Sequence, residues 1–241
     1  MTMALYRLEG LRLARGTEFE LTVDEMTVSS GETLCLAGPT GSGKTTLLRV
    51  LSGLQPIESG RVQFDGRIWC HGMASLAEIR TIALVPQRPI LLSRSVRANL
   101  EYGLLLRRAA SDERVDAMLT CLGLTKLAKQ AANTLSGGQM QLVALGRALI
   151  LAPRVLLLDE PTANLDPQCV ALVEQVLNEY RRSRNTTLIW ATHNLFQTRR
   201  VADRVALLLG GQIVEVASCE EFFDRPRDYR TADFVNGRMV Y

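Results

Sequence analysis

The sequence predicts an α/β fold in which a mostly parallel sheet is covered by helices on both faces. Three observations support this prediction. Strand-length apolar runs alternate with helical segments, a glycine-rich loop joins one strand to a helix at residues 38–45, and residues 93–149 switch to a helical period. We expect a single domain, residues 1–241, whose sheet core comprises 1–92 and 150–241 and is interrupted by a helical subdomain at 93–149.

The first strands alternate apolar and polar residues and predict an antiparallel β region. They span residues 4–13 and 19–28, with a turn at 15–16 between them. Two shorter strands are expected within residues 60–70, around the turn at 65–66. Since tight turns join antiparallel neighbours, these strands predict an N-terminal antiparallel β subdomain beside the parallel core.

The parallel core is predicted from short, continuously apolar runs, which are typical of strands buried on both faces. One strand at 33–37 leads through the glycine loop into a helix that ends near residue 53, and another strand follows at 81–85. After Pro153 the predicted order is strand 155–158, helix 167–182, strand 186–191, a further helix, and strands 204–209 and 212–216.

The helical subdomain is predicted from apolar residues that recur at spacings of three and four. Val96, Leu100 and Leu104 mark its first helix, and Val115 and Leu119 mark its second. Its last helix opens at residues 135–139 and ends near residue 150.

Bulk composition excludes several classes of protein. The net charge of +3 is small and the arginines are scattered, so no nucleic-acid partner is expected. The five cysteines are far apart and form no C-x-x-C pair, which is typical of reduced thiols. Residues 1–10 lack the apolar run of a signal peptide, and no segment reaches the ~18 apolar residues of a membrane span.

The glycine loop is the most informative motif, because its pattern G-x-x-x-x-G-K-T lies between a strand and a helix. Glycines let backbone N–H groups surround phosphate oxygens, and the helix start adds partial positive charge. A lysine and a threonine hydroxyl then supply charge for the β- and γ-phosphates and a ligand for Mg²⁺. The motif predicts a site for a nucleoside triphosphate, formed by Gly38, Pro39, Thr40, Gly41, Ser42, Gly43, Lys44, Thr45 and Thr46.

Two further motifs in the second half narrow the chemistry. The strand at 155–158 ends in Asp159, placed to hold a magnesium shell, and Glu160, placed to orient or deprotonate water. About twenty residues earlier, Ser136 and two glycines begin a helix that offers a hydroxyl and open N–H groups to a phosphate.

Together these motifs resemble, in order and spacing over roughly 230 residues, the ATPase subunit of an ATP-binding cassette (ABC) transporter. The resemblance implies a P-loop, RecA-like core. The glycine loop is similar to the family's Walker A segment, and residues 155–160 are similar to its Walker B strand with the catalytic glutamate. Residues 163–166 resemble its D-loop, and residues 135–139 resemble its signature.

The resemblance also implies roles for single residues. Gln87 corresponds to the Q-loop glutamine, a magnesium ligand, and His193 to the switch histidine that contacts the γ-phosphate. In the family, the signature of one subunit closes over ATP held by the other, so a head-to-tail dimer is implied. The residues that would face that ATP across the dimer are Ser136, Gly137, Gly138, Gln139 and Asp166.

The sequence departs from the family in three places. The family usually has an aromatic residue in the first turn that stacks on adenine, and the corresponding position is assigned to Arg15, so weak base selectivity is expected. Residues 140–142 replace a more polar run after the signature, and Gly146 replaces the commoner alanine.

The short C-terminal end and the runs at 86–92 and 234–241 resemble ATPases of bacterial tungstate and phosphate-type oxyanion importers. This implies permease subunits, an extracytoplasmic substrate-binding protein and a peripheral position at the cytoplasmic face of the inner membrane. Residues 90–92 suit either a groove for a permease helix or internal packing. Alternatives are a phosphate, molybdate or amino-acid importer, a soluble non-transport ABC ATPase, and a nucleotide-gated module without turnover.

Overall fold

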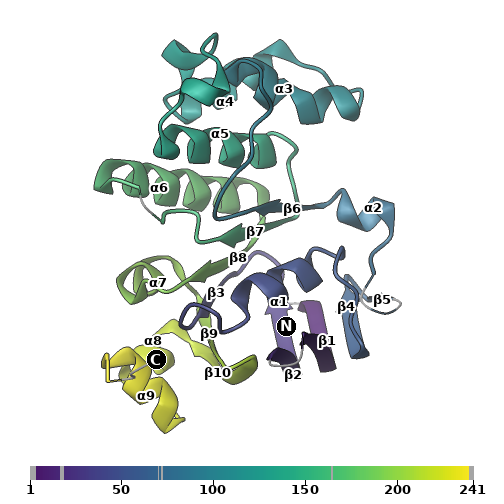
Figure 1. Ribbon diagram of the computed structural model, residues 1–241, viewed down its shortest axis with the longest axis vertical. Helices are drawn as coiled ribbons and strands as arrows, with labels where there is room; N and C mark the ends of the chain where they lie inside the picture. Colours follow the sequence, from purple (N-terminus) through teal and green to yellow (C-terminus); the bar gives the residue numbers. More distant parts are fainter. Residues whose placement is uncertain (1–3, 17–18, 70, 72, 164, 239–241) are drawn as a thin grey trace.

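The strands of the described residues form one sheet that ends at β6, with helices packed on both of its faces and further helices beyond β6 (Figure 1). This computed structural model describes residues 4–16, 19–69, 71, 73–163 and 165–238. The strand order across the sheet is β5-β4-β1-β2-β10-β9-β3-β8-β7-β6.

The N-terminal part of the sheet is antiparallel, as predicted. β1 (Ala4–Arg15) pairs with β2 (Phe19–Ser29) and with β4 (Ser59–Phe64), which pairs with β5 (Arg67–Trp69). This region continues directly into the rest of the sheet, because β2 meets β10 (Gln212–Ser218) and β10 runs antiparallel to β9 (Arg204–Leu209).

The remaining strands are parallel and carry the predicted phosphate loop at one end. β3 (Thr33–Ala37) lies between β9 and β8 (Thr187–Thr192), followed by β7 (Val155–Asp159) and β6 (Ile82–Val85). Every residue of β3, β7 and β8 is buried, as expected for strands covered on both faces. The carboxyl ends of parallel strands meet at one edge of a sheet, which is where ligands bind in such folds.

Alternate residues of these strands enter two hydrophobic cores. Leu34 and Leu36 pack in the core shared with α1 (Lys44–Leu51) and the N-terminal strands. Cys35 and Ala37 face the other core, together with α6 (Pro167–Arg184).

The stretch between β6 and β7 is helical, with α3 (Val96–Leu106), α4 (Asp112–Cys121) and α5 (Gly137–Leu149). The predicted apolar residues Val96, Leu100 and Leu104 are buried. These helices gather at one end of the molecule (Figure 1). Their apolar residues belong to the same core as those of β7 and α6, so the subdomain boundaries at 93 and 149 stay a prediction.

Four short α-helices, and the 3-10 turns Thr125–Leu127 and Ala132–Thr134, complete the fold of the described residues. The helix predicted after the strand at 186–191 is α7 (Leu195–Val201). Three short helices were not predicted from the sequence: α2 (Leu76–Ile79), α8 (Cys219–Asp224) and α9 (Tyr229–Val235). The signal for two of them is a capping box, in which a serine is followed three residues later by glutamate: Ser75 with Glu78, and Ser218 with Glu221.

The described part of the chain contains no helix long and apolar enough to span a bilayer. Its cysteines, Cys35, Cys121, Cys169 and Cys219, are free thiols, and Cys70 lies outside the described residues.

Candidate functional site

The phosphate loop lies between the end of β3 and the start of α1, as the motif predicts. Two of its glycines have positive φ angles and lie so close to neighbouring atoms that a side chain would clash with them. At Gly38 (φ 147°) a Cβ would lie 2.2 Å from the carbonyl oxygen of Leu208. At Gly43 (φ 107°) a Cβ would lie 2.9 Å from Cζ of Phe19. The loop can therefore wrap closely only because these positions lack side chains.

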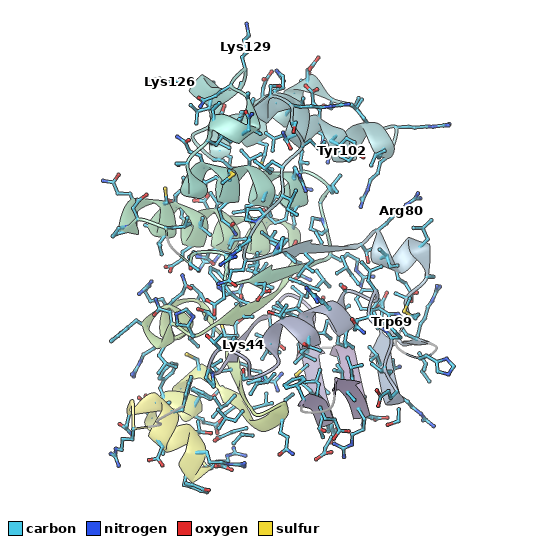
Figure 2. The ribbon with its side chains drawn as sticks, viewed as in Figure 1. Lys44, Trp69, Arg80, Tyr102, Lys126 and Lys129 are labelled. Atoms are coloured by element: carbon cyan, nitrogen blue, oxygen red, sulfur yellow. The ribbon has the colours of Figure 1, made fainter. Side chains whose placement is uncertain are left out.

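Lys44, the first residue of α1, is folded back over this loop. Its ammonium donates to the carbonyl oxygens of Gly38 and Pro39, both at 2.7 Å. Burial lowers the pKa of Lys44, and the carboxylates of Glu160 and Asp159 oppose that shift. Figure 2 shows Lys44 inside the molecule, whereas the exposed Lys126 and Lys129 extend from its helical end.

Thr45 and Asp159 join the loop to the end of β7. The Thr45 hydroxyl lies 2.9 Å and 3.1 Å from the two carboxylate oxygens of Asp159. Burial raises the pKa of Asp159, the Thr45 hydrogen bond lowers it, and the neighbouring charge of Glu160 raises it further. The pair is an all-oxygen donor set, which is the kind that a hard cation such as Mg²⁺ prefers.

Glu160 and His193 form a second pair beside the first. Nδ1 of His193 lies 2.8 Å from Oε1 of Glu160, within hydrogen-bonding distance. The Glu160 side chain is 11% exposed and that of His193 is 62% exposed, so the histidine lies on the solvent side. Glu160 also has a left-handed backbone (φ 48°), which is unusual for a residue with a side chain.

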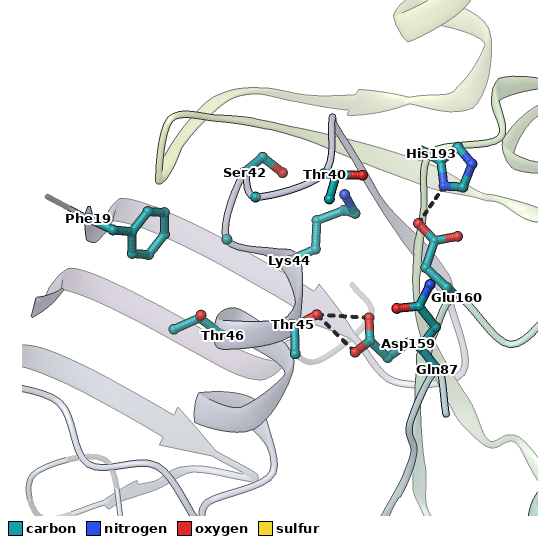
Figure 3. A pocket seen from close by; sticks show the side chains of 12 residues that line it. Phe19, Thr40, Ser42, Lys44, Thr45, Thr46, Gln87, Asp159, Glu160 and His193 are labelled. Carbon is teal, nitrogen blue, oxygen red and sulfur yellow. Dashed lines mark hydrogen bonds and ion pairs between the residues drawn. The ribbon is translucent and has the colours of Figure 1, made fainter. Parts of the chain in front are cut away.

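Lys44, the Thr45–Asp159 pair and the Glu160–His193 pair all line one cavity of about 340 Å³ (Figure 3). Gln87 also lines it, and the hydroxyl of Ser42 is buried there without a partner in the described structure. A basic loop, an unpartnered buried hydroxyl and carboxylates at the opposite wall fit a polyphosphate with its metal ion. The predicted residues that line the cavity are Thr40, Gly41, Ser42, Gly43, Lys44, Thr45, Thr46, Gln87, Asp159, Glu160 and His193.

Gly38 and Pro39 belong to the phosphate loop, where their carbonyl oxygens accept from Lys44, whereas the predicted signature residues and Asp166 lie at helix starts outside this cavity. Ser136 caps α5: its hydroxyl accepts from the backbone N–H of Gln139, whose side chain accepts from the backbone N–H of Ser136. Asp166 caps α6 through its carboxylate alone, which accepts from the backbone N–H groups of Gln168 and Cys169, both at 2.9 Å. A Cβ on Gly138 would lie 3.5 Å from Leu165, so the starts of α5 and α6 are close together.

One aromatic residue that lines the cavity was not predicted from the sequence. Phe19, the first residue of β2, lines the cavity, and its ring lies against Gly43 and Gly211. Phe19 pairs with Arg15 across the hairpin, but the Arg15 side chain lies outside what the structure describes. The signal was available, because Phe19 is the first aromatic residue after the turn at 15–16.

Comparisons with known proteins agree with this geometry. Residues 21–163 match the family model described as ABC transporter. The chain is 40% identical over 230 residues to the phosphate import ATP-binding protein PstB 2 of Natronomonas pharaonis, covering 90% of this chain and 81% of that protein. It is 37% identical to the tungstate uptake system ATP-binding protein TupC of Peptoclostridium acidaminophilum, covering 86% and 96%.

Solved structures of the same kind superpose on nearly the whole chain. The cbiO1 protein of Clostridium perfringens, described as part of the ABC transporter complex cbiONQ, has a TM-score of 0.81 at 29% identity and covers 98% of this chain and 96% of that chain. The chain therefore belongs to the ABC transporter family. It is an ATP-binding subunit of the importer type, an ATPase coupled to transport.

Proposed function

We propose that the cavity binds ATP with Mg²⁺ and cleaves its γ-phosphate. The observation that carries this proposal is the meeting of Lys44, the Thr45–Asp159 pair and the Glu160–His193 pair around one cavity. The loop amides and Lys44 would hold the phosphates. Thr45, Asp159 and Gln87 would hold the metal, which when bound neutralises charge that develops on the phosphate oxygens.

In this proposal Glu160 is the group that accepts a proton from the attacking water. Its carboxylate is largely enclosed and lies beside the loop that would present the γ-phosphate. His193 lies within hydrogen-bonding distance of that carboxylate through Nδ1 and lines the cavity, and in this proposal it would contact the γ-phosphate.

The active form in this proposal is a head-to-tail dimer. Ser136 and the following glycines begin a 13-residue helix, whose free N–H groups and dipole favour a phosphate. In a single copy they line no part of the described cavity. A second copy would bring Ser136, Gly137, Gly138, Gln139 and Asp166 to the ATP held by the first.

A Glu160→Gln variant tests this function directly. It keeps the size of the side chain and removes the proton acceptor, so kcat should fall at least about hundredfold while ATP still binds. With Mg²⁺ and ATP, the variant should migrate as a stable dimer by size exclusion with light scattering, and without ATP as a monomer. Full turnover by Glu160→Gln, or no binding of ATP by the wild type in calorimetry, would refute the proposal.

We further propose that Ile90 contacts a helix of a membrane permease. Ile90 is 85% exposed, and its backbone is anchored because Arg147 donates to its carbonyl oxygen at 3.0 Å. Leu91, in contrast, packs partly buried against the core, which favours internal packing for that residue. The residues predicted as one segment thus divide between two roles.

Substitution at the two positions separates those roles. Ile90→Asp should reduce transport by the complete transporter about tenfold and leave ATP hydrolysis by the isolated subunit unchanged, because it removes a surface contact only. Leu91→Asp is the contrasting variant, since a charge against the core should lower the unfolding temperature. Equal loss of hydrolysis and transport in Ile90→Asp would contradict a docking role.

The cargo proposed is an oxyanion, tungstate first and phosphate as the alternative. The similarity to TupC supports tungstate and the similarity to PstB 2 supports phosphate. An extracytoplasmic binding protein would deliver the anion, and the subunit would lie at the cytoplasmic face of the membrane, held by its permease. Uptake of tungstate and of phosphate by cells with and without this chain distinguishes the two cargoes.

A further inference from the structure

A chain of polar side chains lies behind the cavity and takes no part in lining it. The hydroxyl of Thr162, two residues after Glu160, donates to Oε1 of Gln197 at 2.9 Å. The amide nitrogen of Gln197 donates to Oε1 of Glu174 on α6 at 2.9 Å. Arg200 pairs with the same carboxylate at 2.7 Å. Because the Glu174 carboxylate can only accept, the amide nitrogen of Gln197 must face it, and the amide oxygen is left to accept from the Thr162 hydroxyl.

Gln197 also connects to the switch histidine through the start of α7. Asn194, which follows His193, caps this helix by accepting from the backbone N–H of Gln197 at 3.0 Å. The Glu160–His193 contact at 2.8 Å and the Thr162–Gln197 bond then close a ring. One side of the ring is the turn after β7, and the other side is the turn after β8.

The ring encloses a strained residue. Glu160 has a left-handed backbone (φ 48°), which is unfavourable in a residue with a side chain and persists only where the surroundings enforce it. The backbone N–H of Glu160 donates to the carbonyl oxygen of Ala191 at 2.9 Å, and the carbonyl oxygen of Glu160 accepts from the backbone N–H of Ala163 at 3.1 Å. The Thr162–Gln197 bond is the side-chain contact that fixes this turn against α7.

We propose that Gln197 is a positioning residue for hydrolysis. Through its bond to Thr162, Gln197 fixes the position of the strained turn at Glu160 relative to His193. The Glu160 carboxylate is thereby kept at the cavity wall. Gln197 is 1% exposed and does not line the cavity, so it acts through Glu160 and His193 and not on ATP. The inference rests on the proposed roles of those two residues.

The test removes the bond from each side and then from both. Thr162→Val deletes only the hydroxyl, Thr162→Ser keeps it, and Gln197→Leu deletes the amide. In full-length protein, at a concentration where specific activity has reached its plateau, we expect Thr162→Val and Gln197→Leu each to lower kcat about tenfold. KM for ATP should change less than about twofold, since neither residue lines the cavity. Thr162→Ser should retain wild-type kcat.

The double variant reports whether both changes break the same connection. Thr162→Val with Gln197→Leu should lose about the same tenfold as either change alone, whereas independent effects would multiply to about a hundredfold. Gln175→Leu is the matched control. It removes a glutamine that donates to Glu179 at 2.9 Å on the exposed side of α6, and its kcat should not change.

Three results would overturn the inference. The first is an unchanged kcat in Thr162→Val. The second is a kcat in the double variant that falls by the product of the two single effects. The third is a fall in kcat that matches the fall in the folded fraction, as measured by thermal unfolding. Wild-type turnover and its loss in Glu160→Gln are measured in the same assay. They report on the proposed function itself, so its failure is distinguished from failure of the Gln197 role.

Discussion

At the scale of the single residue, Phe19 is the aromatic side chain in the described lining of the cavity. An aromatic ring offers a flat face to any base and makes no hydrogen bond that reads its edge. The ring lies beside Gly43, at the base of the phosphate loop. It can therefore stack on a nucleotide whose phosphates enter that loop. We still predict that the protein discriminates weakly between bases. The physical reason for this prediction is now stacking on Phe19 and no longer stacking on Arg15.

We predict that Phe19→Ala weakens ATP binding about tenfold, because base stacking is worth about 1–3 kcal/mol. Calorimetry should show the same loss for GTP. Tripolyphosphate, which has no base, serves as the control ligand and should bind the variant as it binds the wild type. An equal loss of tripolyphosphate binding would mean that Phe19 supports the loop through Gly43 and does not contact the base.

At the scale of elements, Gly146 allows α5 to approach its neighbours closely. A Cβ at this position would lie 2.7 Å from methyl carbons of both Leu100 on α3 and Leu122 after α4. The replacement of alanine noted in the sequence therefore has a structural reason. In this protein the buried leucine methyl groups occupy the space that an alanine side chain would need.

We predict that Gly146→Ala lowers the free energy of unfolding by about 1 kcal/mol. Overpacking costs about 1–3 kcal/mol, and removing a glycine from a helix interior returns about 0.5–1 kcal/mol. Denaturant unfolding measures the difference. Gly137→Ala, at the first residue of the same helix, is the control, because a Cβ there meets nothing within 4 Å. A more stable Gly146→Ala would show that the leucines move aside at little cost.

The elements predictable from sequence were those with a strong local signal. Continuously apolar runs identified β3, β7 and β8, and the glycine pattern identified the loop before α1. The short helices α8 and α9 were missed because they have only one or two turns, too few for a helical period to emerge. Their stability comes from caps and packing, which a periodicity argument does not detect.

The contents of the site were predictable, but its contacts were not. Glu160 and His193 each follow a buried strand, so a shared edge was expected, yet nothing local states that their side chains meet at 2.8 Å. Gln197 carries no motif, and its bond to Thr162 spans 35 residues of chain. Such pairs depend on the order of strands in the sheet, which local sequence patterns do not specify.

At the scale of the whole molecule, the predicted signature at the start of α5 lies outside the cavity that the phosphate loop lines. Lys44 lines the cavity, whereas Ser136 caps a helix outside it. If ATP needs both, each site in a two-fold dimer takes its loop from one chain and its signature from the other. This arrangement makes a prediction that a monomeric ATPase does not.

We predict that two inactive variants restore activity when mixed. Lys44→Ala removes the positive charge that would bind the phosphates, and Ser136→Arg fills the space in front of the signature with a large side chain. Each homodimer therefore has no competent site. A mixed dimer combines the intact loop of the Ser136→Arg chain with the intact signature of the Lys44→Ala chain and has one. At equal mixing about half of the dimers are mixed, so turnover should recover to about a quarter of the wild-type rate. Mixing Lys44→Ala with Glu160→Gln, where both defects lie on the loop side, is the control and should stay inactive. Recovery absent from the first mixture, at concentrations where dimers form, would show that each chain completes its own site.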